Sequence, residues 1–361
     1  MIGARKPSIS RRKFTQSIAA VAASHSSLIQ LGFAQTQGSN SDPKPRRIDV
    51  HHHILPPEYL AAVGESAVAN PAPNREVPKW DVAKSLEAMD RNGMTSAVVS
   101  VSAPGILLDD AAATSRLART CNDFAARMVA DHPTRYGMFA SLPLPDTRAS
   151  LLELEYALDV LHAEGVVLMT NYRDRYLGDP GFTPVLDELN RRKAVVYVHP
   201  ATCGCNVNVL PDNPASLIEF PHDSTRTITS LLFSGTFSRC PDIRFIFSHA
   251  GGTLPFLANR IARIAATDRH LSARVPEGVM PVFKRLYYDT ASSANPMSFG
   301  ALMQLVTPKS VLLGTDFPFV PEPGMKATIA GLRSVGLDET AVRAIEGGNA
   351  VALFPRLGAV G

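Results

Sequence analysis

The sequence is poor in cysteine and nearly balanced in charge, and each feature excludes a class of protein. Its 361 residues include four cysteines, too few for the disulfide framework of a small secreted domain. Cys203 and Cys205 lie close together, but their spacing is poor for a closed zinc knuckle, so we expect ordinary buried thiols. The formal net charge is only +3, and part of it lies in the first 13 residues, so the charge balance indicates no nucleic-acid-binding surface.

Long apolar runs are also missing. The most apolar stretch near the N-terminus, SIAAVAASHSSLIQLGFA, is interrupted by Ser24, His25, Ser26 and Ser27 and is too weak to span a membrane. The whole chain is 45% hydrophobic and 19% charged, which excludes disorder throughout. Its length is enough for one large domain or two small ones.

Residues 1–41 are typical of an export signal with a linker. A basic segment (ARKPSISRRKF) precedes the weakly apolar stretch, and a polar segment (QTQGSNSD) follows it, which is the order of a signal peptide. The segment SRRKF resembles the twin-arginine motif, and GFA offers a cleavage site after Ala34. Twin-arginine export carries folded proteins, so we predict a periplasmic protein. The alternative is a disordered tail on a cytoplasmic one.

From Arg46 onward, runs of β-branched and aromatic residues alternate with helix-like segments. Eight candidate strands lie at residues 46–53, 96–103, 135–144, 165–172, 194–201, 244–251, 285–292 and 311–319. Helical patterns cover residues 81–93, 113–133, 149–165, 182–193, 253–264 and 338–354. This order predicts an α/β protein with a parallel sheet, closed as a (β/α)8 TIM barrel in a single domain at residues 42–361. An open doubly wound sheet is the alternative, although no glycine-rich phosphate turn follows the first strand.

Histidines and one aspartate stand at the carboxyl ends of these strands, where a barrel builds its active site. Five candidate ligands or bases meet this condition: His51, His53, His199, His249 and Asp316. Residues two apart on a strand share a side, so His51 and His53 can face the barrel axis while His52 points outward. Imidazole and carboxylate groups bind Zn²⁺ and related ions. We therefore predict one divalent metal ion with an open position. Taken singly, a histidine in such a strand is more often a hydrogen-bonded structural residue, and Asp316 alone could be a helix cap or a turn residue.

The chain resembles the decarboxylase branch of the amidohydrolase superfamily. The matching segments are IDVHHHILPPEY (48–59), AVVYVHPA (194–201), FIFSHAGGTLPFLANR (245–260) and LLGTDFPF (312–319). The branch includes aminocarboxymuconate-semialdehyde, resorcylate and 6-methylsalicylate decarboxylases. Relatives that act on aminocarboxymuconate semialdehyde carry an arginine where this chain has Ser85. Trp80 and the segments SVSAPG (100–105) and EFPHDSTRT (219–227) are closer to the methylsalicylate type.

The resemblance implies a role for each residue of the site. It implies a metal bound by four residues, namely His51, His53, His199 and Asp316. His249 becomes the catalytic acid and base. Arg260 matches an arginine that holds the substrate carboxylate in a neighbouring subunit, which implies at least a homodimer. His222 and Arg226 become candidates for contact with the substrate or with the loop after the fifth strand.

Two reactions fit this site. In the first, the metal polarises a small aromatic or enol carboxylic acid, His249 or Asp316 protonates the ring carbon, and carbon dioxide leaves. In the second, metal-bound water hydrolyses a lactone, ester or amide. The fourth strand ends in LMTNY, without the lysine that a carbamate-bridged binuclear hydrolase needs, so we favour the decarboxylase. A metal-binding protein without catalysis is a third reading. Nitrogen-rich ligation favours zinc, with manganese as the alternative.

Overall fold

The structure is a computed structural model that describes residues 46–69, 76–206, 210 and 213–359. The predictions for residues 1–41, including the twin-arginine segment and cleavage after Ala34, lie outside these residues. Within the described ranges, no helix is both long enough and apolar enough to cross a membrane.

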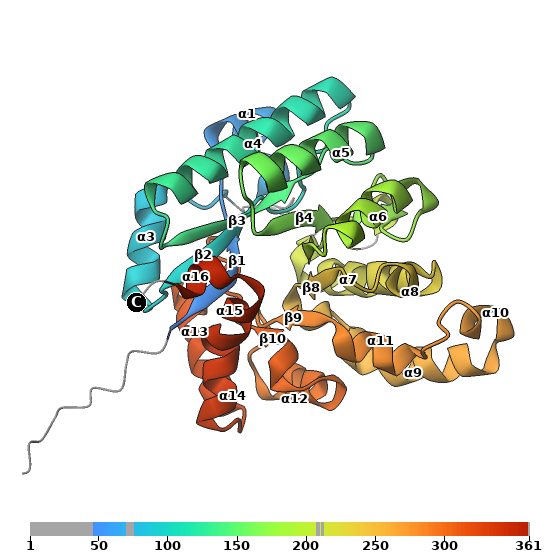
Figure 1. The fold of residues 1–361 in the computed structure, drawn as a ribbon. Helices are drawn as coiled ribbons and strands as arrows, with labels where there is room; N and C mark the ends of the chain where they lie inside the picture. Colours follow the sequence, from blue (N-terminus) through green and yellow to red (C-terminus); the bar gives the residue numbers. More distant parts are fainter. Residues whose placement is uncertain (1–45, 70–75, 207–209, 211–212, 360–361) are drawn as a thin grey trace, which may run out of the picture. The chain divides into compact units, whose positions relative to one another are not determined.

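Eight parallel strands form the centre of the fold (Figure 1). In order around the sheet they are β1 (Ile48–His53), β2 (Ser96–Ser100), β3 (Tyr136–Ser141), β4 (Gly165–Met169), β7 (Val195–His199), β8 (Arg244–Phe247), β9 (Tyr287–Asp289) and β10 (Val311–Leu312). A small antiparallel hairpin, β5 (Asn171–Tyr172) and β6 (Arg175–Tyr176), follows β4. All eight strands expected from the sequence are present.

The sheet closes on itself between its first and last strands. β10 is short, and the segment just after it takes over the pairing with β1. The amide of Val50 donates to the carbonyl of Leu313 at 2.9 Å, and the amide of Asp316 donates to the carbonyl of His51 at 2.8 Å. Farther along, the amide of His53 donates to the carbonyl of Phe317 at 2.7 Å. These bonds confirm the predicted barrel.

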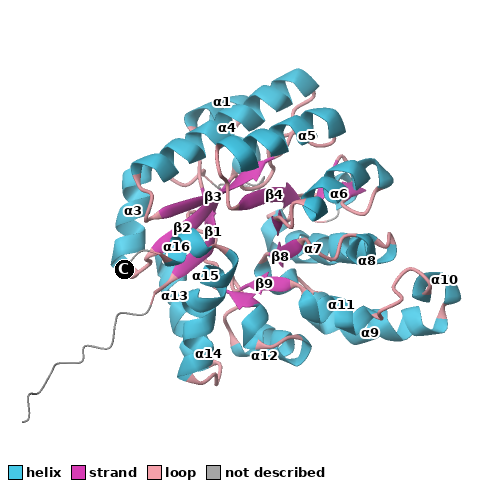
Figure 2. Cartoon of the chain, in the orientation of Figure 1, coloured by secondary structure: helices cyan, strands magenta, loops and turns pink. Residues whose placement is uncertain are grey.

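Helices surround the strands (Figure 2). After each barrel strand comes one of α3 (Val82–Arg91), α4 (Ala111–Asp131), α5 (Thr147–Glu155), α6 (Thr183–Arg191), α7 (Ala215–Phe233), α9 (Leu254–Thr267), α12 (Pro296–Leu305) and α13 (Glu322–Ser334). Shorter helices are α1 (Pro57–Val63), α2 (Glu65–Val68), α8 (Thr236–Arg239), α10 (Arg269–Ser272) and α11 (Val279–Arg285). The C-terminal segment contains α14 (Glu339–Arg343), a π-helical turn η6 (Ala344–Gly348), α15 (Asn349–Leu353) and α16 (Pro355–Gly358).

Local sequence explains where several helices begin. The side chains of Asp81, Asp110 and Asp146 accept hydrogen bonds from the first-turn amides of α3, α4 and α5, which satisfies donors that have no partner inside the helix. Each of these helices starts within two residues of the predicted position. Helices α7, α12 and α13 are additions to the predicted set.

Buried aliphatic and aromatic side chains fill the barrel and the layer between strands and helices. Phe139 on β3 stacks on Tyr197 on β7, with ring centroids 5.2 Å apart. The predicted strand segments are longer than the observed ones mainly at their carboxyl ends, as in residues 194–201 against Val195–His199. The extra residues are the loops that build the rim of the barrel.

Candidate metal centre and active-site pocket

The three consecutive histidines of β1 point in two directions. His51 and His53 point inward and approach each other, with their Nε2 atoms 3.0 Å apart. His52 points outward between β1 and α3, where its Nδ1 lies 3.1 Å from Asp49 Oδ2 and its Nε2 lies 2.8 Å from Ser85 Oγ. Alternation along the strand therefore separates an inward pair from a histidine that joins the strand to a helix.

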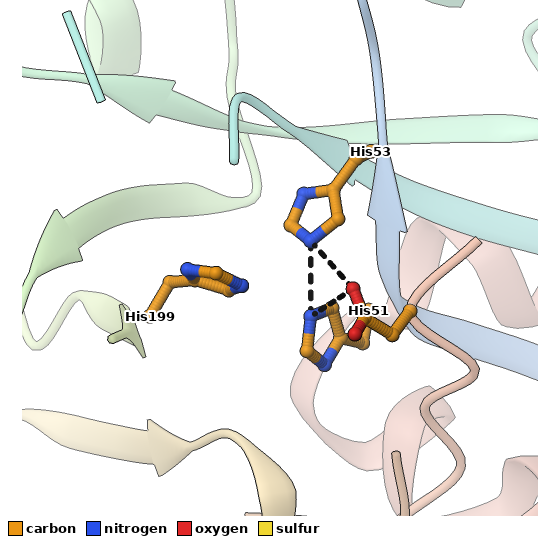
Figure 3. A group of neighbouring side chains, drawn as sticks. His51, His53 and His199 are labelled. Carbon is orange, nitrogen blue, oxygen red and sulfur yellow. Dashed lines mark hydrogen bonds and ion pairs between the residues drawn. The ribbon is translucent and has the colours of Figure 1, made fainter. Parts of the chain in front are cut away.

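Four residues from three strand ends meet inside the rim. They are His51, His53, His199 and Asp316, and one ligand atom from each lies within 4.8 Å of the others. Asp316 Oδ1 is 3.3 Å from His51 Nε2 and 3.2 Å from His53 Nε2. Ligand atoms about 2.1 Å from a zinc ion are about 3.4 Å apart in a tetrahedron. Figure 3 shows the three imidazole rings turned toward one point.

The tautomers of the three imidazoles also fit a metal site. His51 Nδ1 is 2.9 Å from Asp289 Oδ2, His53 Nδ1 is 3.2 Å from the carbonyl of Ser100, and His199 Nδ1 is 2.9 Å from the carbonyl of Pro200. Carbonyl and carboxylate oxygens only accept, so each Nδ1 carries the proton. In the neutral form of each imidazole, Nε2 then keeps its lone pair, as a metal ligand must. The donor set suits one divalent ion.

Electrostatics favour an ionised Asp316 beside two neutral imidazoles and one protonated imidazole, that of His51. Burial alone would raise the pKa of Asp316, but the adjacent histidines hold it well below its usual value. Burial lowers the pKa of His53, and burial with the neighbouring imidazoles holds that of His199 well below its usual value. Burial also opposes protonation of His51, yet Asp289 and Asp316 raise its pKa to about 10. A metal ion would therefore displace a proton from His51 on binding.

Asp289, at the end of β9, is a site residue that the sequence analysis missed. Its Oδ2 accepts from His51 Nδ1 and, at 2.8 Å, from the hydroxyl of Tyr197. Its Oδ1 accepts from the amide of His249 at 2.9 Å. Burial opposes its ionisation, but the charge and hydrogen bond of His51, together with His249 and Tyr197, outweigh burial and lower the pKa of Asp289. The sequence feature that could have identified it is the aspartate at the end of the strand segment RLYYD.

His249 lies next to the four-residue group in a constrained turn. His249 and Ala250 have φ values of 53° and 57°, and Asp316 has a φ of 64°. Non-glycine residues rarely adopt this left-handed conformation, and such residues concentrate at functional sites. His249 Nε2 is 3.4 Å from Asp316 Oδ2. Its buried Nδ1 has no hydrogen-bond partner among the described residues.

A pocket of about 850 Å³ opens above these residues. His199, His249 and Asp316 contribute to its lining. Apolar side chains supply much of the wall: Val68, Pro104, Leu217, Phe220, Pro221, Pro255, Phe256, Met297, Phe319 and Val320. Polar side chains in the lining are small: Ser102, Thr202, Ser216, Thr253, Ser292, Ser293 and Ser298. The pocket can therefore hold a small, mostly apolar molecule against the histidine and aspartate groups.

The structure describes all three predicted substrate-binding residues, and none of them belongs to the lining of this pocket. Arg260 is exposed on α9, and Arg226 is exposed on α7, 3.8 Å from Asp223. His222 is half-buried on α7, with Nδ1 2.8 Å from the carbonyl of Ile218. Arg226 and His222 thus make contacts within their own helix.

Two other sequence predictions concern the surroundings of the site. The residues after β4, Thr170 and Asn171, bind the carboxylate of Asp223, and this strand end has no lysine. Cys203 is buried and Cys205 is exposed. Neither belongs to a group of potential metal ligands in the described ranges.

Comparisons with known proteins agree with this geometry. Residues 48–356 match the family described as amidohydrolase. "Decarboxylase yanB" of Aspergillus niger is 39% identical over 329 residues, covering 86% of this chain and 88% of the relative. The 6-methylsalicylic acid decarboxylase of Penicillium expansum is 36% identical over 315 residues, covering 86% and 97%. A crystal structure described as an amidohydrolase II superposes with a TM-score of 0.79 at 30% identity, covering 86% of this chain and 99% of the other.

Proposed function

The chain belongs to the amidohydrolase family, and we propose that it is a metal-dependent, non-oxidative decarboxylase of small hydroxylated aromatic acids of the 6-methylsalicylate type. One observation carries the proposal: His249 lies 3.4 Å from Asp316, a member of the group of potential metal ligands, at a largely apolar pocket. Similarity to decarboxylases over 86% of the chain supports it.

The pocket suits a substituted benzene ring. Phe220 and Phe319 line it, and their rings approach His199 and His53 with centroid distances of 6.3 and 5.5 Å. Aromatic walls favour flat aromatic ligands. Serine hydroxyls can bind a ring hydroxyl, and the apolar wall can accept a methyl group. Compounds of this shape with one carboxylate are the proposed substrates.

The reaction needs one proton delivered to the ring. A bound divalent ion would polarise the carboxylate and the neighbouring hydroxyl oxygen of the substrate. His249 donates the proton from Nε2 to the ring carbon that carries the carboxylate. The bond between this carbon and the carboxyl carbon then breaks, and its electron pair restores the aromatic ring. Carbon dioxide leaves, and solvent returns a proton to the enzyme.

Asp316 connects the ligand group with the acid. Its Oδ1 faces His51 and His53, while its Oδ2 faces His249 Nε2. The Oδ2 atom therefore orients the imidazole of His249. Asp289 accepts from the backbone amide of the same histidine and so helps to hold its position.

Zinc is the proposed metal. Three imidazole nitrogens and one carboxylate oxygen form a donor set that zinc favours, whereas manganese prefers oxygen-rich sites. Elemental analysis of the purified protein tests this assignment, and one equivalent of manganese in place of zinc would contradict it.

Arg260 is the proposed partner of the substrate in a homodimer or larger homo-oligomer. It is exposed on α9, whose first turn lines the pocket mouth through Pro255 and Phe256. Phe256 and Met297 are each 85% exposed, which is unusual for large apolar side chains. A second copy that covered them would bring further side chains, including Arg260, toward the neighbouring pocket.

We also propose export to the periplasm by the twin-arginine route, on the strength of the SRRKF segment. Fractionation of a bacterial host that expresses the whole chain tests this. Replacing Arg11 and Arg12 by lysine keeps the charge but removes the guanidinium pair, so the protein should then accumulate in the cytoplasm. Export that continues in this variant would contradict the proposal.

A turnover assay tests the reaction. The purified protein is incubated with 6-methylsalicylate and other hydroxybenzoates, and in parallel with lactones and esters. We expect products lighter by one carbon dioxide from the aromatic acids only, and loss of this activity on chelation with recovery on metal addition. Addition of water to a lactone or ester, without decarboxylation, would identify a hydrolase instead.

A further inference from the structure

Asp223 on α7 is a fully buried carboxylate outside the group of potential metal ligands. Its side chain has 0% exposure. Its Oδ2 accepts from Thr170 Oγ1 and, at 2.9 Å, from Asn171 Nδ2. Its Oδ1 accepts from the hydroxyl of Tyr176 at 2.6 Å. One side chain thus binds the end of β4 and the β5–β6 hairpin to α7.

The same hydrogen bonds extend to the strand end that carries His199. Thr170 Oγ1 accepts from the amide of Ala201 at 2.9 Å, and Asn171 Nδ2 donates to the carbonyl of Ala201 at 3.2 Å. The amide of Thr170 donates to the carbonyl of His199 at 2.9 Å. Ala201 is two residues beyond His199, so Asp223 acts on the backbone that places this imidazole.

Asp223 is also joined to the pocket wall. Phe220 and Pro221, within three residues of it on α7, line the pocket. The carbonyl of Pro221 accepts from the amide of Thr253 at 3.3 Å. The helix turn that precedes Asp223 therefore rests on the loop that follows His249.

We propose that Asp223 is a positioning residue that, through Thr170 and Ala201, holds His199 in place for metal binding and fixes the Phe220 wall beside it. The inference rests on the proposed metal-dependent function. Without the carboxylate, the buried donors of Thr170 and Asn171 and the half-buried hydroxyl of Tyr176 lose their common acceptor. Thr170 and Asn171 then hold the backbone of Ala201 less firmly, and the ligand atom of His199 becomes less well placed for metal binding.

Metal affinity is the readout that separates positioning from general stability. Titration of the metal-free protein with Zn²⁺ gives the dissociation constant, and the visible spectrum of the Co²⁺-loaded protein reports the ligand geometry. We expect Asp223→Ala to weaken Zn²⁺ binding at least about 10-fold and to alter the Co²⁺ spectrum. Asp223→Asn keeps an acceptor oxygen and should restore part of the affinity.

Thr170→Val tests the same connection if Asp223→Ala does not fold. Valine has nearly the shape of threonine but cannot link Asp223 to the Ala201 amide. It should weaken Zn²⁺ binding similarly, and the double variant should lose less than the sum of the two single losses.

Glu346→Ala is the matched control, because Glu346 is as buried as Asp223. It forms ion pairs with Arg47, just before β1, and with Arg333 on α13. The substitution should lower the melting temperature but leave the Zn²⁺ dissociation constant unchanged. Wild-type affinity and spectrum in folded Asp223→Ala and Thr170→Val would overturn the inference. A wild-type protein that binds metal without decarboxylating any acid would overturn the proposed reaction alone, and one that binds no metal would overturn both.

Discussion

His51, His52 and His53 are neighbours in the sequence but have different surroundings in the fold. His51 faces Asp289 and Asp316 inside the barrel, while His52 joins Asp49 to Ser85 outside it. Alternation along the strand makes this division predictable from residue spacing alone. It also supplies a control for any experiment on the metal site, because the adjacent histidine is just as buried.

His51→Ala should reduce bound metal to less than about half an equivalent, because one of four ligands is lost. His52→Ala should keep the wild-type metal content but lower the free energy of unfolding by about 1–3 kcal/mol, because buried partners lose a hydrogen bond. Elemental analysis and chemical denaturation of both variants measure the two effects. Equal metal content in the two variants would mean that His51 is not a ligand.

His249→Asn should keep the metal and lose at least about 10²–10⁴-fold in turnover, because the acid–base group is removed. The control is His270→Asn, since His270 is exposed on α10. Decarboxylation rates at saturating substrate, with metal content measured in parallel, provide the comparison. Unchanged turnover in His249→Asn would remove this residue from the mechanism.

Most residues of the site were predictable from the sequence, because they lie at the ends of predicted strands. Five site residues lie at or near the carboxyl ends of strands, and parallel strands of a barrel bring these ends to one rim: His51, His53, His199, His249 and Asp316. Asp289 ends a strand too, but a single aspartate after YY also fits a simple turn residue. Its contacts with His51 and His249 join residues far apart in the chain, so local sequence did not identify it.

Among the elements, α7 shows where periodicity fails. Its sequence contains Pro221 inside the helix and a buried polar face with Asp223, Ser224, Thr225 and Thr227. Proline is rare in helix interiors, and buried polar residues obscure the apolar repeat. The strands of the barrel have near-continuous apolar runs, so their positions were evident from the sequence.

The loop between β8 and α9 fits closely against α7. Gly252 has a φ of 69°, and a Cβ atom there would lie 1.9 Å from the carbonyl oxygen of Pro221. Gly252→Ala should therefore lower the free energy of unfolding by about 1–3 kcal/mol. It should also reduce turnover, because the loop carries His249. Thermal melting and rate measurements test both effects.

Gly300→Ala is the matched control. Gly300 is exposed within α12, and a Cβ atom there would meet nothing within 4 Å. Alanine is the better helix former, so we expect stability to stay unchanged or rise by about 0.5–1 kcal/mol. Equal stability of the two variants would mean that the loop can move to accommodate the added methyl group, and it would contradict the close contact with α7.

At the scale of the whole molecule, the question is whether Arg260 serves its own site or a neighbour's. Arg260→Ala should raise KM for the acid about 10–100-fold, since a charge-assisted contact is lost. Co-expression with His249→Asn subunits distinguishes the two arrangements. If Arg260 acts across the interface, a mixed dimer regains one intact site of its two, and activity returns. Failure to regain activity in isolated mixed dimers would contradict action across the interface.

The closure of the barrel has a consequence for how the protein acquires its ion. β1 is among the first parts of the described chain and the Asp316 segment is among the last, yet hydrogen bonds join them, and both supply ligands. A growing chain cannot assemble the full ligand set until its final strand has been synthesised and docked. Ion uptake should therefore occur late in folding and stabilise the junction between β1 and the Asp316 segment. A metal-starved protein should open there first, with the fastest amide hydrogen exchange along that junction.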